Sequence, residues 1–568
     1  MCGIVGYIGK RNAASVVLAG LKRLEYRGYD SFGVATLDDK IHIDKRAGRI
    51  GSITNLQGNI GIGHTRWATH GEPSDCNAHP HIDCENKIAI VHNGVIDNYM
   101  DLKVRMIQQG HTFRSTTDSE VIAHLIEEEY KNGDILGAVK RALPKLKGSY
   151  ALLVIAIGSL EIIAARKSSP LAIGIGDGET FIGSDAMPLM EYTKKVIYLE
   201  DGDIAHVFEA GAIIYNDGEV VVRIPHIVKW SLDDTSLGAF PHYMLKEIYE
   251  QPKVFYDAIR SPITLSLMEH INVIGCGSSY YAGMIFKYLC EDICRLPVSV
   301  YFGSEFRYFP PPIKGTVIGI TQSGETADTL VALKCANKCD TIAITNVSDS
   351  SVTRSVDNVI MMNAGPEISV AATKSFVAQL AILLQVINSI RGGEFDDVLL
   401  DGHQDVEKVL NVDLTTAVDL CKKASSIFYM GRGAFYPIVL EGALKMKEVA
   451  YIHAEGFPAG ELKHGSIALV TECTPVVAIC MPGDTYDVTI SNVKEMQARG
   501  APVIVIGEVG DVGVMMTTQY PVMVPKTHPL LRVVTTTVVL QLLAYYVAVA
   551  LERDVDKPRN LAKSVTVE

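Results

Sequence analysis

The feature that most constrains the fold is an internal duplication in the second half of the chain. A glycine-containing turn follows an apolar segment at Gly275 and again at Gly431, 156 residues later. A second pair of turns repeats in the same order, as Gly324-Glu325-Thr326 and then Gly483-Asp484-Thr485, 159 residues apart. Each copy runs strand, polar turn and helix twice, which predicts a parallel sheet with helices on both faces. Ligands in such folds bind beyond the carboxyl ends of the strands.

The first 225 or so residues have a different pattern and predict an α+β layer structure. Residues 4–8 form a short apolar strand, and residues 13–24 have helical spacing. Further strand-like runs follow at 60–63, 88–91, 150–157 and 161–165. Such alternation is typical of stacked sheets covered by helices. A strand that begins at residue 4 buries the N-terminus, which is uncommon for a chain end without a function.

Composition and charge exclude several classes of protein. The chain of 568 residues is 48% hydrophobic and 21% charged, which is typical of three or four globular domains. A net charge of −13 argues against nucleic acid or an anionic membrane as a partner. Eleven scattered cysteines without a signal-like segment predict a cytoplasmic location. The most apolar run, 533–551, contains threonines, tyrosines and Gln541, and therefore predicts a buried helix rather than a membrane span.

Cys2 is a candidate nucleophile. Once Met1 is removed, this residue carries both a thiol and an α-amine, and such an amine has a pKa of about 7.7–8.0. The amine can take a proton from a nucleophile and return it to a leaving group. A small residue that happens to follow Met1 is the alternative, so the assignment depends on further residues.

Two polar segments follow predicted strands and fit a site that hydrolyses a carboxamide. They are residues 63–71 and His92-Asn93-Gly94. Thiol attack on an amide needs donors for the developing oxyanion, and a side-chain amide beside a glycine N–H can supply two. An arginine such as Arg66 is a natural clamp for an α-carboxylate, and Asp118 could hold an α-ammonium. A plain Asn-Gly turn and a surface arginine are the alternatives.

A competing interpretation of the same region is a metal site. Four residues have the ligand types and the spacing of a zinc site: Cys76, His79, His81 and Cys84. Pro80 and the polar residues around it favour a mobile loop instead, and we expect no metal.

The first copy of the duplication contains a candidate phosphate site. Residues 321–326 follow the apolar strand 316–320 and combine three hydroxyls with successive backbone N–H groups at the start of a helix. The similar turn at 275–279 favours a phosphosugar ligand, although an ordinary helix cap is the alternative. This turn lacks the third glycine of a dinucleotide fingerprint. The candidate ligand-binding residues are Ser278, Ser279, Thr321, Gln322, Ser323 and Thr326.

The second copy carries candidate acid–base residues. Glu441, Lys445 and Glu448 share one helix face. A carboxylate beside a lysine can move a proton between adjacent sugar carbons, whereas a solvated ion pair is the plainer interpretation. His464 adds an imidazole that titrates near neutral pH.

Together these motifs resemble the family of isomerizing glutamine–fructose-6-phosphate aminotransferases, over nearly the whole chain. The segments that carry the resemblance are 1–7, 27–31, 64–71, 92–94, 243–252 and 558–568. The resemblance implies an N-terminal-nucleophile glutaminase domain followed by two flavodoxin-like sugar-isomerase (SIS) domains. We expect a glutaminase domain at 1–225, a linker at 226–242, SIS domains at 243–400 and 401–555, and a catalytic tail at 556–568.

The resemblance also implies roles for individual residues. In the glutaminase half these are the nucleophile Cys2, the oxyanion-hole residues Asn93 and Gly94, the glutamine-binding pair Arg66 and Asp118, and Trp67 as the gate of an ammonia channel. In the SIS half they are Glu448 as the isomerisation base, His464 as the ring-opening group donated across a dimer interface, and Lys563 as a catalytic lysine of the tail. Lys563 could form a Schiff base with the sugar, with Lys445 as its neighbouring cation.

The implied reaction uses L-glutamine and D-fructose 6-phosphate and makes D-glucosamine 6-phosphate in a homodimer, with no cofactor and no metal. Departures from the family pattern are mild, with Thr321 and Ala372 standing where serine is frequent. Related amidotransferases would need a diphosphosugar loop or a pyrophosphate loop, and the sequence contains neither motif. Two rival functions stay open, namely amination of a different ketose phosphate and sensing of a sugar phosphate without synthase activity.

Overall fold

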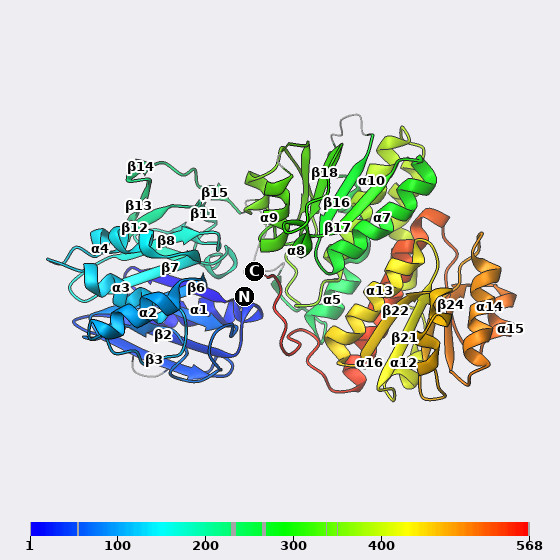
Figure 1. Ribbon diagram of the computed structural model, residues 1–568, viewed down its shortest axis with the longest axis horizontal. Helices are drawn as coiled ribbons and strands as arrows, with labels where there is room; N and C mark the ends of the chain where they lie inside the picture. The colour runs from blue at the N-terminus through cyan, green and yellow to red at the C-terminus, as the bar shows by residue number, and fades with distance from the viewer. Residues whose placement is uncertain are drawn as a thin grey trace. The chain divides into compact units, whose positions relative to one another are not determined.

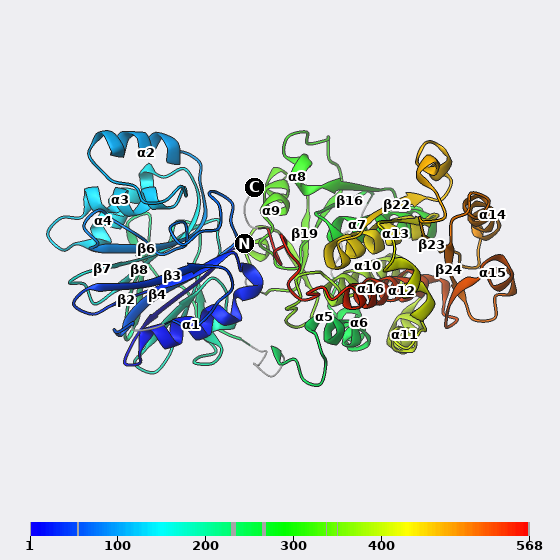
Figure 2. The same cartoon turned by 90° about the horizontal axis from the view of Figure 1, so that it is seen from below.

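The computed structural model describes residues 2–53, 56–228, 235–263, 269–336, 338–348 and 350–565. The chain forms two compact units, one made of Met1–Asp234 with Ala562–Glu568 and the other of Thr235–Leu561. Figures 1 and 2 show the ribbon of each unit in two views. Residues 229–234 of the expected linker, including Trp230, lie outside the described residues.

The first unit contains an antiparallel sheet of eight strands. Its order is β15-β11-β9-β10-β1-β4-β2-β3, so that the N-terminal strand β1 lies between β10 and β4. The strands are β1 (Gly3–Ile8), β2 (Ser31–Leu37), β3 (Ile41–Ala47), β4 (Ile60–Arg66), β9 (Ala172–Ile175), β10 (Thr180–Gly183), β11 (Lys195–Tyr198) and β15 (His226–Ile227). The predicted strand at the N-terminus is therefore confirmed.

A second antiparallel sheet has seven strands in the order β14-β13-β12-β8-β7-β6-β5. They are β5 (His81–Ile82), β6 (Ile88–Ile96), β7 (Gly148–Ala156), β8 (Ile162–Lys167), β12 (Ile204–Phe208), β13 (Gly211–Asn216) and β14 (Glu219–Val221). Helix α1 (Ala13–Arg23) covers the outer face of the first sheet. Helices α2 (Tyr99–Gln108), α3 (Glu120–Glu129) and α4 (Ile135–Ala142) cover the second.

Alternation along the strands explains this layering. On β7, Leu153 and Ile155 pack in the core between the two sheets, whereas Leu152 and Val154 pack in the core under helices α2 to α4. Successive side chains of a strand point to opposite faces, so a strand that is apolar at every position needs a layer on each side. The predicted α+β arrangement of stacked sheets covered by helices is confirmed.

The second unit contains two parallel five-stranded sheets with the same topology. The first has the order β17-β16-β18-β19-β20 and the second β22-β21-β23-β24-β25. The strands are β16 (Ile271–Gly275), β17 (Val298–Phe302), β18 (Thr316–Ile320), β19 (Thr341–Thr345), β20 (Asn358–Met361), β21 (Ser426–Gly431), β22 (His453–Pro458), β23 (Val476–Ile479), β24 (Val503–Glu508) and β25 (Tyr520–Val524). Each sheet has the flavodoxin-like order 2-1-3-4-5, which confirms the predicted duplication.

Helices pack around both sheets. They are α5 (Tyr243–Tyr249), α6 (Gln251–Ile259), α7 (Ser278–Cys294), α8 (Gly303–Phe306), α9 (Ala327–Cys335), α10 (Lys374–Ile390), α11 (Asp396–Val409), α12 (Thr415–Cys421), α13 (Phe435–Lys445), α14 (Tyr486–Gln497), α15 (Val512–Thr517) and α16 (Arg532–Ala550). The expected boundary at residue 400 falls inside α11, and the position of this boundary stays a prediction.

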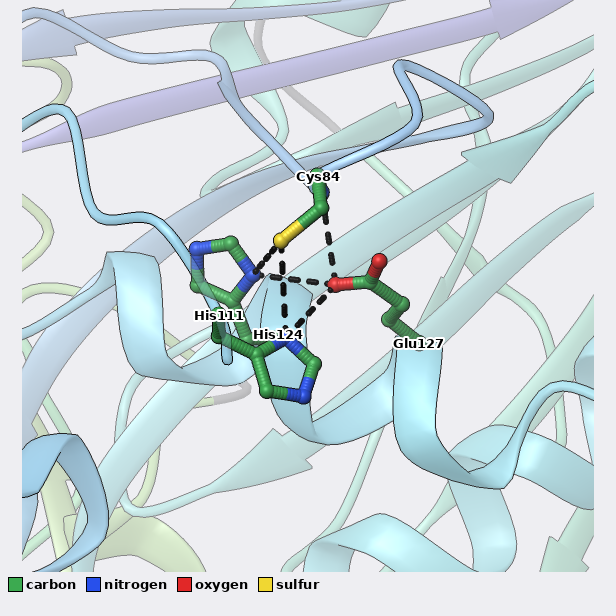
Figure 3. Close-up of side chains that lie close together, drawn as sticks. All are labelled: Cys84, His111, His124 and Glu127. Atoms are coloured by element: carbon green, nitrogen blue, oxygen red, sulfur yellow. Dashed lines mark hydrogen bonds and ion pairs between the residues drawn. The ribbon is translucent and has the colours of Figure 1, made fainter. Parts of the chain in front are cut away.

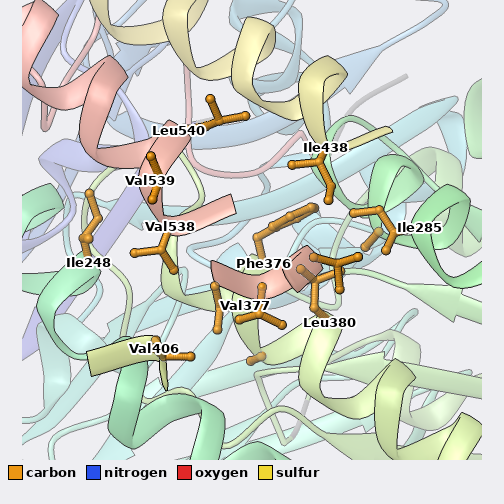
Figure 4. Packing of buried hydrophobic residues seen from close by; sticks show 14 of the residues in the cluster. Ile248, Ile285, Phe376, Val377, Leu380, Val406, Ile438, Val538, Val539 and Leu540 are labelled. Carbon is orange, nitrogen blue, oxygen red and sulfur yellow. The ribbon is translucent and has the colours of Figure 1, made fainter. Parts of the chain in front are cut away.

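The two SIS copies share one hydrophobic core (Figure 4). Phe376 of α10 and Ile285 of α7 belong to the same buried cluster as Ile438 of α13 and Val538 of α16. The segment Pro529–Ala550 is long and apolar enough to cross a membrane, but 83% of its most apolar window is buried inside the protein. Residues 533–550 thus lie in the predicted buried helix, and Leu551 caps its end.

Candidate functional site

Cys2 lies directly before β1 and faces the end of β4. Gly3 pairs with Thr65 across the sheet, which places the next residues of β4 and its following loop beside the thiol. The Cys2 sulfur accepts a hydrogen bond from the Trp67 N–H at 3.4 Å and lies 3.5 Å from the Trp67 carbonyl oxygen. Antiparallel pairing therefore brings the nucleophile and the polar segment together across 65 residues of sequence.

Asn93 and Gly94 lie on β6 on the other side of Cys2. The Asn93 side-chain amide donates to the Cys2 carbonyl oxygen at 3.0 Å. Gly94 has φ +137°, and a Cβ at this position would lie 2.1 Å from the Ser149 carbonyl oxygen. Only glycine fits this backbone. The predicted pair of oxyanion donors is thus next to the predicted nucleophile.

Arg66 and Asp118 are both buried near this thiol. The Arg66 guanidinium donates to the carbonyl oxygens of His70, of Gly71 at 2.9 Å and of Glu72 at 3.4 Å, so that it holds the loop after β4. Asp118 accepts from the Ile96 N–H at 2.9 Å. These contacts fix both charged side chains before any substrate binds.

The surroundings of Cys2 disfavour its thiolate. Burial raises the pKa of the Cys2 thiol, whereas the Trp67 N–H and Arg66 lower this pKa and Asp118 raises it. Burial is the largest of these effects. A nucleophile of this kind needs a base that removes its proton during attack.

The glycine of the 27–31 motif has a packing role in this site. A Cβ on Gly28 would lie 2.6 Å from the Arg66 carbonyl carbon and 2.7 Å from the Trp67 nitrogen. Thr65 donates from its hydroxyl to the Gly28 carbonyl oxygen, and the Asp30 carboxylate accepts from the Ala68 N–H at 2.8 Å. The motif thus holds the end of β4 close to Cys2.

Sequence reasoning missed a group of four buried histidines: His64, His79, His81 and His92. The rings of His64 and His79 stack with centroids 4.1 Å apart, and those of His79 and His81 are 4.4 Å apart. The His92 Nδ1 lies 2.8 Å from the Ser119 hydroxyl, next to Asp118. Burial lowers the pKa of His64 to about 3, so this histidine is neutral, and its Nε2 lies 3.0 Å from the His92 carbonyl oxygen.

The zinc-like spacing does not form a site from its own four residues. Cys76 is exposed, with its sulfur 3.2 Å from the Ser74 hydroxyl, while His79 and His81 belong to the buried histidine group. Cys84 instead faces His111. His81 pairs with Ile90 across the sheet, and its Nε2 lies 3.0 Å from the Thr117 hydroxyl.

The second site is a buried ion group formed by α13 and its π-helical continuation Met446–Ala450. The Lys445 ammonium lies 3.3 Å from the Glu441 carboxylate and also pairs with Glu448. The side chains of Lys445 and Glu441 are 1% and 2% exposed, which rules out a solvated ion pair. Burial raises the pKa of Glu441 to about 7, although Lys445 opposes the shift.

Ser278 links this ion group to the first SIS copy. It is the first residue of α7, and its hydroxyl donates to the Glu441 carboxylate at 3.0 Å. Gly275 and Ile320 pair across neighbouring strands, so the turns after β16 and β18 lie side by side at the carboxyl edge of the sheet. The candidate phosphate turn and the candidate acid–base residues therefore belong to one region.

The turn after β18 is preorganised by its own hydroxyls. The hydroxyl oxygens of Thr321 and Thr326 lie 2.8 Å apart, and the Gly324 N–H donates to that of Thr321 at 3.2 Å. Thr326 occupies the N-cap position of α9, yet its side chain makes no capping hydrogen bond. A Cβ on Gly324, which has φ +68°, would lie 1.9 Å from the Ser350 hydroxyl. Ser323 accepts from the Glu325 N–H at 3.1 Å, and Gln322 bonds Asn346 through its backbone.

A cavity of about 450 Å³ lies beside Glu448. Tyr451, in the left-handed conformation with φ +60°, accepts on its hydroxyl oxygen from the Arg559 N–H at 2.7 Å. The start of the C-terminal tail thus packs at the cavity, and no sequence signal pointed to Tyr451. The lining residues are Leu444, Lys447, Glu448, Tyr451, Ile452, His453, Arg559, Asn560 and Leu561.

His464 and Lys563 are the remaining predicted catalytic residues of the sugar half. His464 is exposed at the end of the short helical turn Glu461–Lys463. Lys563 belongs to the compact unit that contains residues 1–234. The roles of His464 and Lys563, and that of Trp67 as a gate, stay predictions.

Comparison with known proteins identifies the family. The glutamine amidotransferase domain family matches residues 1–228, and the SIS domain family matches residues 264–389 and 420–551. A Thermus thermophilus protein named glutamine–fructose-6-phosphate aminotransferase (isomerizing) is 44% identical over 605 residues, which cover 100% of both chains. The chain belongs to this family.

Two further relatives agree with this assignment. A protein of the same name from Pyrococcus horikoshii is 44% identical over 601 residues, again with 100% of both chains covered. The C-terminal domain of glucosamine-fructose-6-phosphate aminotransferase from Francisella tularensis superposes with a TM-score of 0.51 at 35% identity, covering 56% of this chain and 99% of that chain. The resemblance and the fold class expected from the sequence are confirmed.

Proposed function

We propose that this chain is an enzyme that makes D-glucosamine 6-phosphate from D-fructose 6-phosphate and the amide nitrogen of L-glutamine, releasing L-glutamate. The observation that carries the proposal is the full-length match to relatives named for this aminotransferase. The convergence of Cys2 with Asn93, and the buried Glu441–Lys445–Glu448 group, supply the chemistry that each half of the reaction needs.

In the glutaminase half, the Cys2 sulfur attacks the side-chain amide carbon of glutamine, while the α-amine takes the thiol proton. The carbonyl oxygen becomes an oxyanion and accepts hydrogen bonds from the Asn93 amide and the Gly94 N–H. The Asn93 amide has two N–H donors, so one can stay on the Cys2 carbonyl. The C–N bond then breaks, ammonia leaves with the returned proton, and water hydrolyses the γ-glutamyl thioester.

Arg66 and Asp118 bind the α-carboxylate and α-ammonium of glutamine in this scheme. Their fixed hydrogen bonds and burial support the proposal, because a clamp that is already ordered loses little entropy on binding. Trp67 lies against the nucleophile and is proposed to gate the path of the ammonia.

In the sugar half, the phosphate of fructose 6-phosphate occupies the turn formed by residues 321–326. His464 opens the ring, and Lys563 forms an imine at C2 that ammonia displaces. Glu448 removes a proton from C1, which gives an enaminol as the imine nitrogen takes up a proton. C2 then gains a proton while the C1 hydroxyl loses its proton and becomes the carbonyl, which completes the conversion of the 2-imino ketose into the 2-amino aldose. Lys445, held between two carboxylates, positions Glu448.

The proposed domains are a glutaminase domain at 1–225, a linker at 226–242, SIS domains at 243–400 and 401–555, and a tail at 556–568. The family matches at 1–228, 264–389 and 420–551 support this division. We also propose a homodimer formed through the SIS half. The exposure of His464 is compatible with its donation to a partner's sugar site.

Replacing Cys2 by alanine tests the assignment of the two sites. The variant should lose glutamine hydrolysis, because no other nucleophile is proposed, but should still convert fructose 6-phosphate to glucose 6-phosphate. Cys76→Ala, at an exposed cysteine of the same unit, is the matched control and should keep both activities. Substantial glutaminase activity in Cys2→Ala would contradict the nucleophile assignment.

A further inference from the structure

A second group of reactive side chains lies in the first unit on the helix-covered face of the seven-stranded sheet. Cys84 comes from the turn between β5 and β6, and His111 follows α2. His124 and Glu127 lie three residues apart on α3, and thus on one helix face. One ligand atom from each of these four residues lies within 4.8 Å of the others. We refer to Cys84, His111, His124 and Glu127 as the Cys84 cluster.

The four ligand atoms face one point (Figure 3). The Cys84 sulfur lies 3.5 Å from the Nδ1 of His111 and 3.5 Å from the Nδ1 of His124. Each of these two nitrogens lies 3.0 Å from the same oxygen, Oε2 of Glu127. A tetrahedral zinc ion with ordinary bond lengths would separate sulfur from nitrogen by about 3.5 Å and nitrogen from oxygen by about 3.3 Å. The two sulfur–nitrogen and two nitrogen–oxygen separations in the cluster are therefore within about 0.3 Å of those in a tetrahedral zinc site.

The outer contacts also fit metal ligation. The distal nitrogen of His124 lies 3.7 Å from the buried Glu120 carboxylate, and that of His111 lies 3.8 Å from Glu128. Metal-bound histidines usually direct their second nitrogen to a carboxylate, which fixes the ring and makes the ligand more basic. The Thr112 N–H donates to the Cys84 sulfur at 3.5 Å.

We propose that the Cys84 cluster binds one Zn²⁺ through the Cys84 sulfur, the two Nδ1 atoms and the Glu127 carboxylate. Zinc is favoured because thiolate, imidazole and carboxylate ligands in a tetrahedron are its usual set. Four protein ligands fill the tetrahedron, which is typical of a structural site rather than a catalytic one. Binding releases the thiol proton and any proton on the two Nδ1 atoms, while Glu127 binds as a carboxylate.

The ion would tie two elements that support the glutamine site. The turn that contains Cys84 leads into β6, which carries Asn93, and α3 begins directly after Asp118 and Ser119.

The expectation of no metal rests on the spacing of the four residues Cys76, His79, His81 and Cys84. Two of the three ligands that complete the cluster with Cys84 come from α3, about 40 residues further on, where no local spacing reveals them.

The alternative is a metal-free network in which both imidazoles donate to Glu127. The Cys84 N–H also donates to the same oxygen, at 3.3 Å, which would give Oε2 three donors. The metal-bound and metal-free states differ in whether the sulfur carries a proton and whether the protein retains zinc.

Metal analysis of the full-length chain decides between them. The protein would be purified from cells grown with added zinc, and its metal content measured by mass spectrometry. We expect about one zinc per chain in the wild type and an at least tenfold lower content in Cys84→Ser and Glu127→Gln. Cys76→Ser is the matched control, because Cys76 is exposed, lies in the segment before β5 and is not in the cluster; it should keep its zinc.

A spectroscopic measurement keeps the proposal testable if a variant folds poorly. Wild-type chain stripped with a chelator and titrated with Co²⁺ should develop the absorption bands of a tetrahedral cobalt thiolate. The chelator should also lower the melting temperature of the wild type and of Cys76→Ser. Wild type that carries no zinc and binds neither Zn²⁺ nor Co²⁺ would overturn the proposal in favour of the metal-free network. Full zinc retention in Cys84→Ser would overturn it as well.

Discussion

Replacing Lys445 by methionine should destabilise the second unit and abolish sugar isomerisation. Methionine keeps much of the length of the side chain but leaves Glu441 and Glu448 without their shared cation. Removing one member of a buried ion pair typically costs about 3–5 kcal/mol, because the other charge stays buried without compensation. Lys445 and Glu441 are only 1% and 2% exposed, so we expect the free energy of unfolding to fall by about 3–5 kcal/mol.

The pH dependence of this loss follows from the carboxyl groups. Burial already raises the pKa of Glu441 to about 7, and loss of Lys445 raises it further. A carboxyl whose pKa is higher in the folded state favours folding at low pH, and this contribution is lost as the pH rises through the folded pKa. The variant should therefore be closer to wild type near pH 5.5 than near pH 8.

Urea unfolding of the second unit at both pH values measures the effect. The double variant Glu441→Gln/Lys445→Met, in which the more buried of the two unpaired carboxylates is removed, should recover part of the stability but none of the isomerase activity. Lys447→Met, at an exposed lysine of the same segment, is the control for stability. A Lys445→Met chain that loses less than about 1 kcal/mol at pH 8, a value typical of surface pairs, would contradict a stabilising role of Lys445 in a buried ion group.

Three further substitutions separate the two sites. Gly94→Ala places a Cβ 2.1 Å from the Ser149 carbonyl oxygen, so glutaminase activity should fall by about 10²-fold or more while isomerisation of fructose 6-phosphate is kept. A glutaminase rate equal to that of the wild type would exclude the Gly94 backbone from the oxyanion hole. Thr326→Val removes one hydroxyl of the phosphate turn, and a lost hydrogen bond to a charged group is worth about 1.5–3 kcal/mol. The KM for fructose 6-phosphate should therefore rise about ten- to a hundred-fold, with the KM for glutamine unchanged. An unaltered KM for the sugar would show that the turn has only a structural role. Lys563→Arg keeps the charge but cannot form an imine, so it should retain glutamine hydrolysis and lose sugar isomerisation, and near wild-type synthesis would show that the tail only packs.

Much of the fold could be predicted because its signals are periodic or repeated. The turns at Gly275 and Gly431 indicate the duplicated parallel sheets, and the apolar run of α16 indicates a buried helix. The predicted glutaminase residues also converge, because Cys2 and Arg66 lie at ends of paired strands and Asn93 lies on the facing sheet. A polar segment that follows an apolar strand-like run can be recognised from the sequence alone.

Contacts between distant side chains could not be predicted in the same way. Ser278 and Glu441 come from different SIS copies, yet one hydrogen bond joins them. Tyr451 and Arg559 meet at the cavity beside Glu448 without any motif. Spacing groups Cys84 with its sequence neighbours, whereas the folded chain places it beside α3. In each case the partners are fixed by packing of elements rather than by spacing along the chain.

Transfer of a labelled nitrogen tests whether the amide nitrogen of glutamine reaches the sugar. The full-length chain would be given fructose 6-phosphate and glutamine labelled with ¹⁵N in the side-chain amide, and the products analysed by mass spectrometry. We expect glucosamine 6-phosphate that carries the label, together with unlabelled glutamate, and no labelled sugar from Cys2→Ala. Labelled ammonia without any amino sugar, or labelled product from Cys2→Ala, would contradict this expectation.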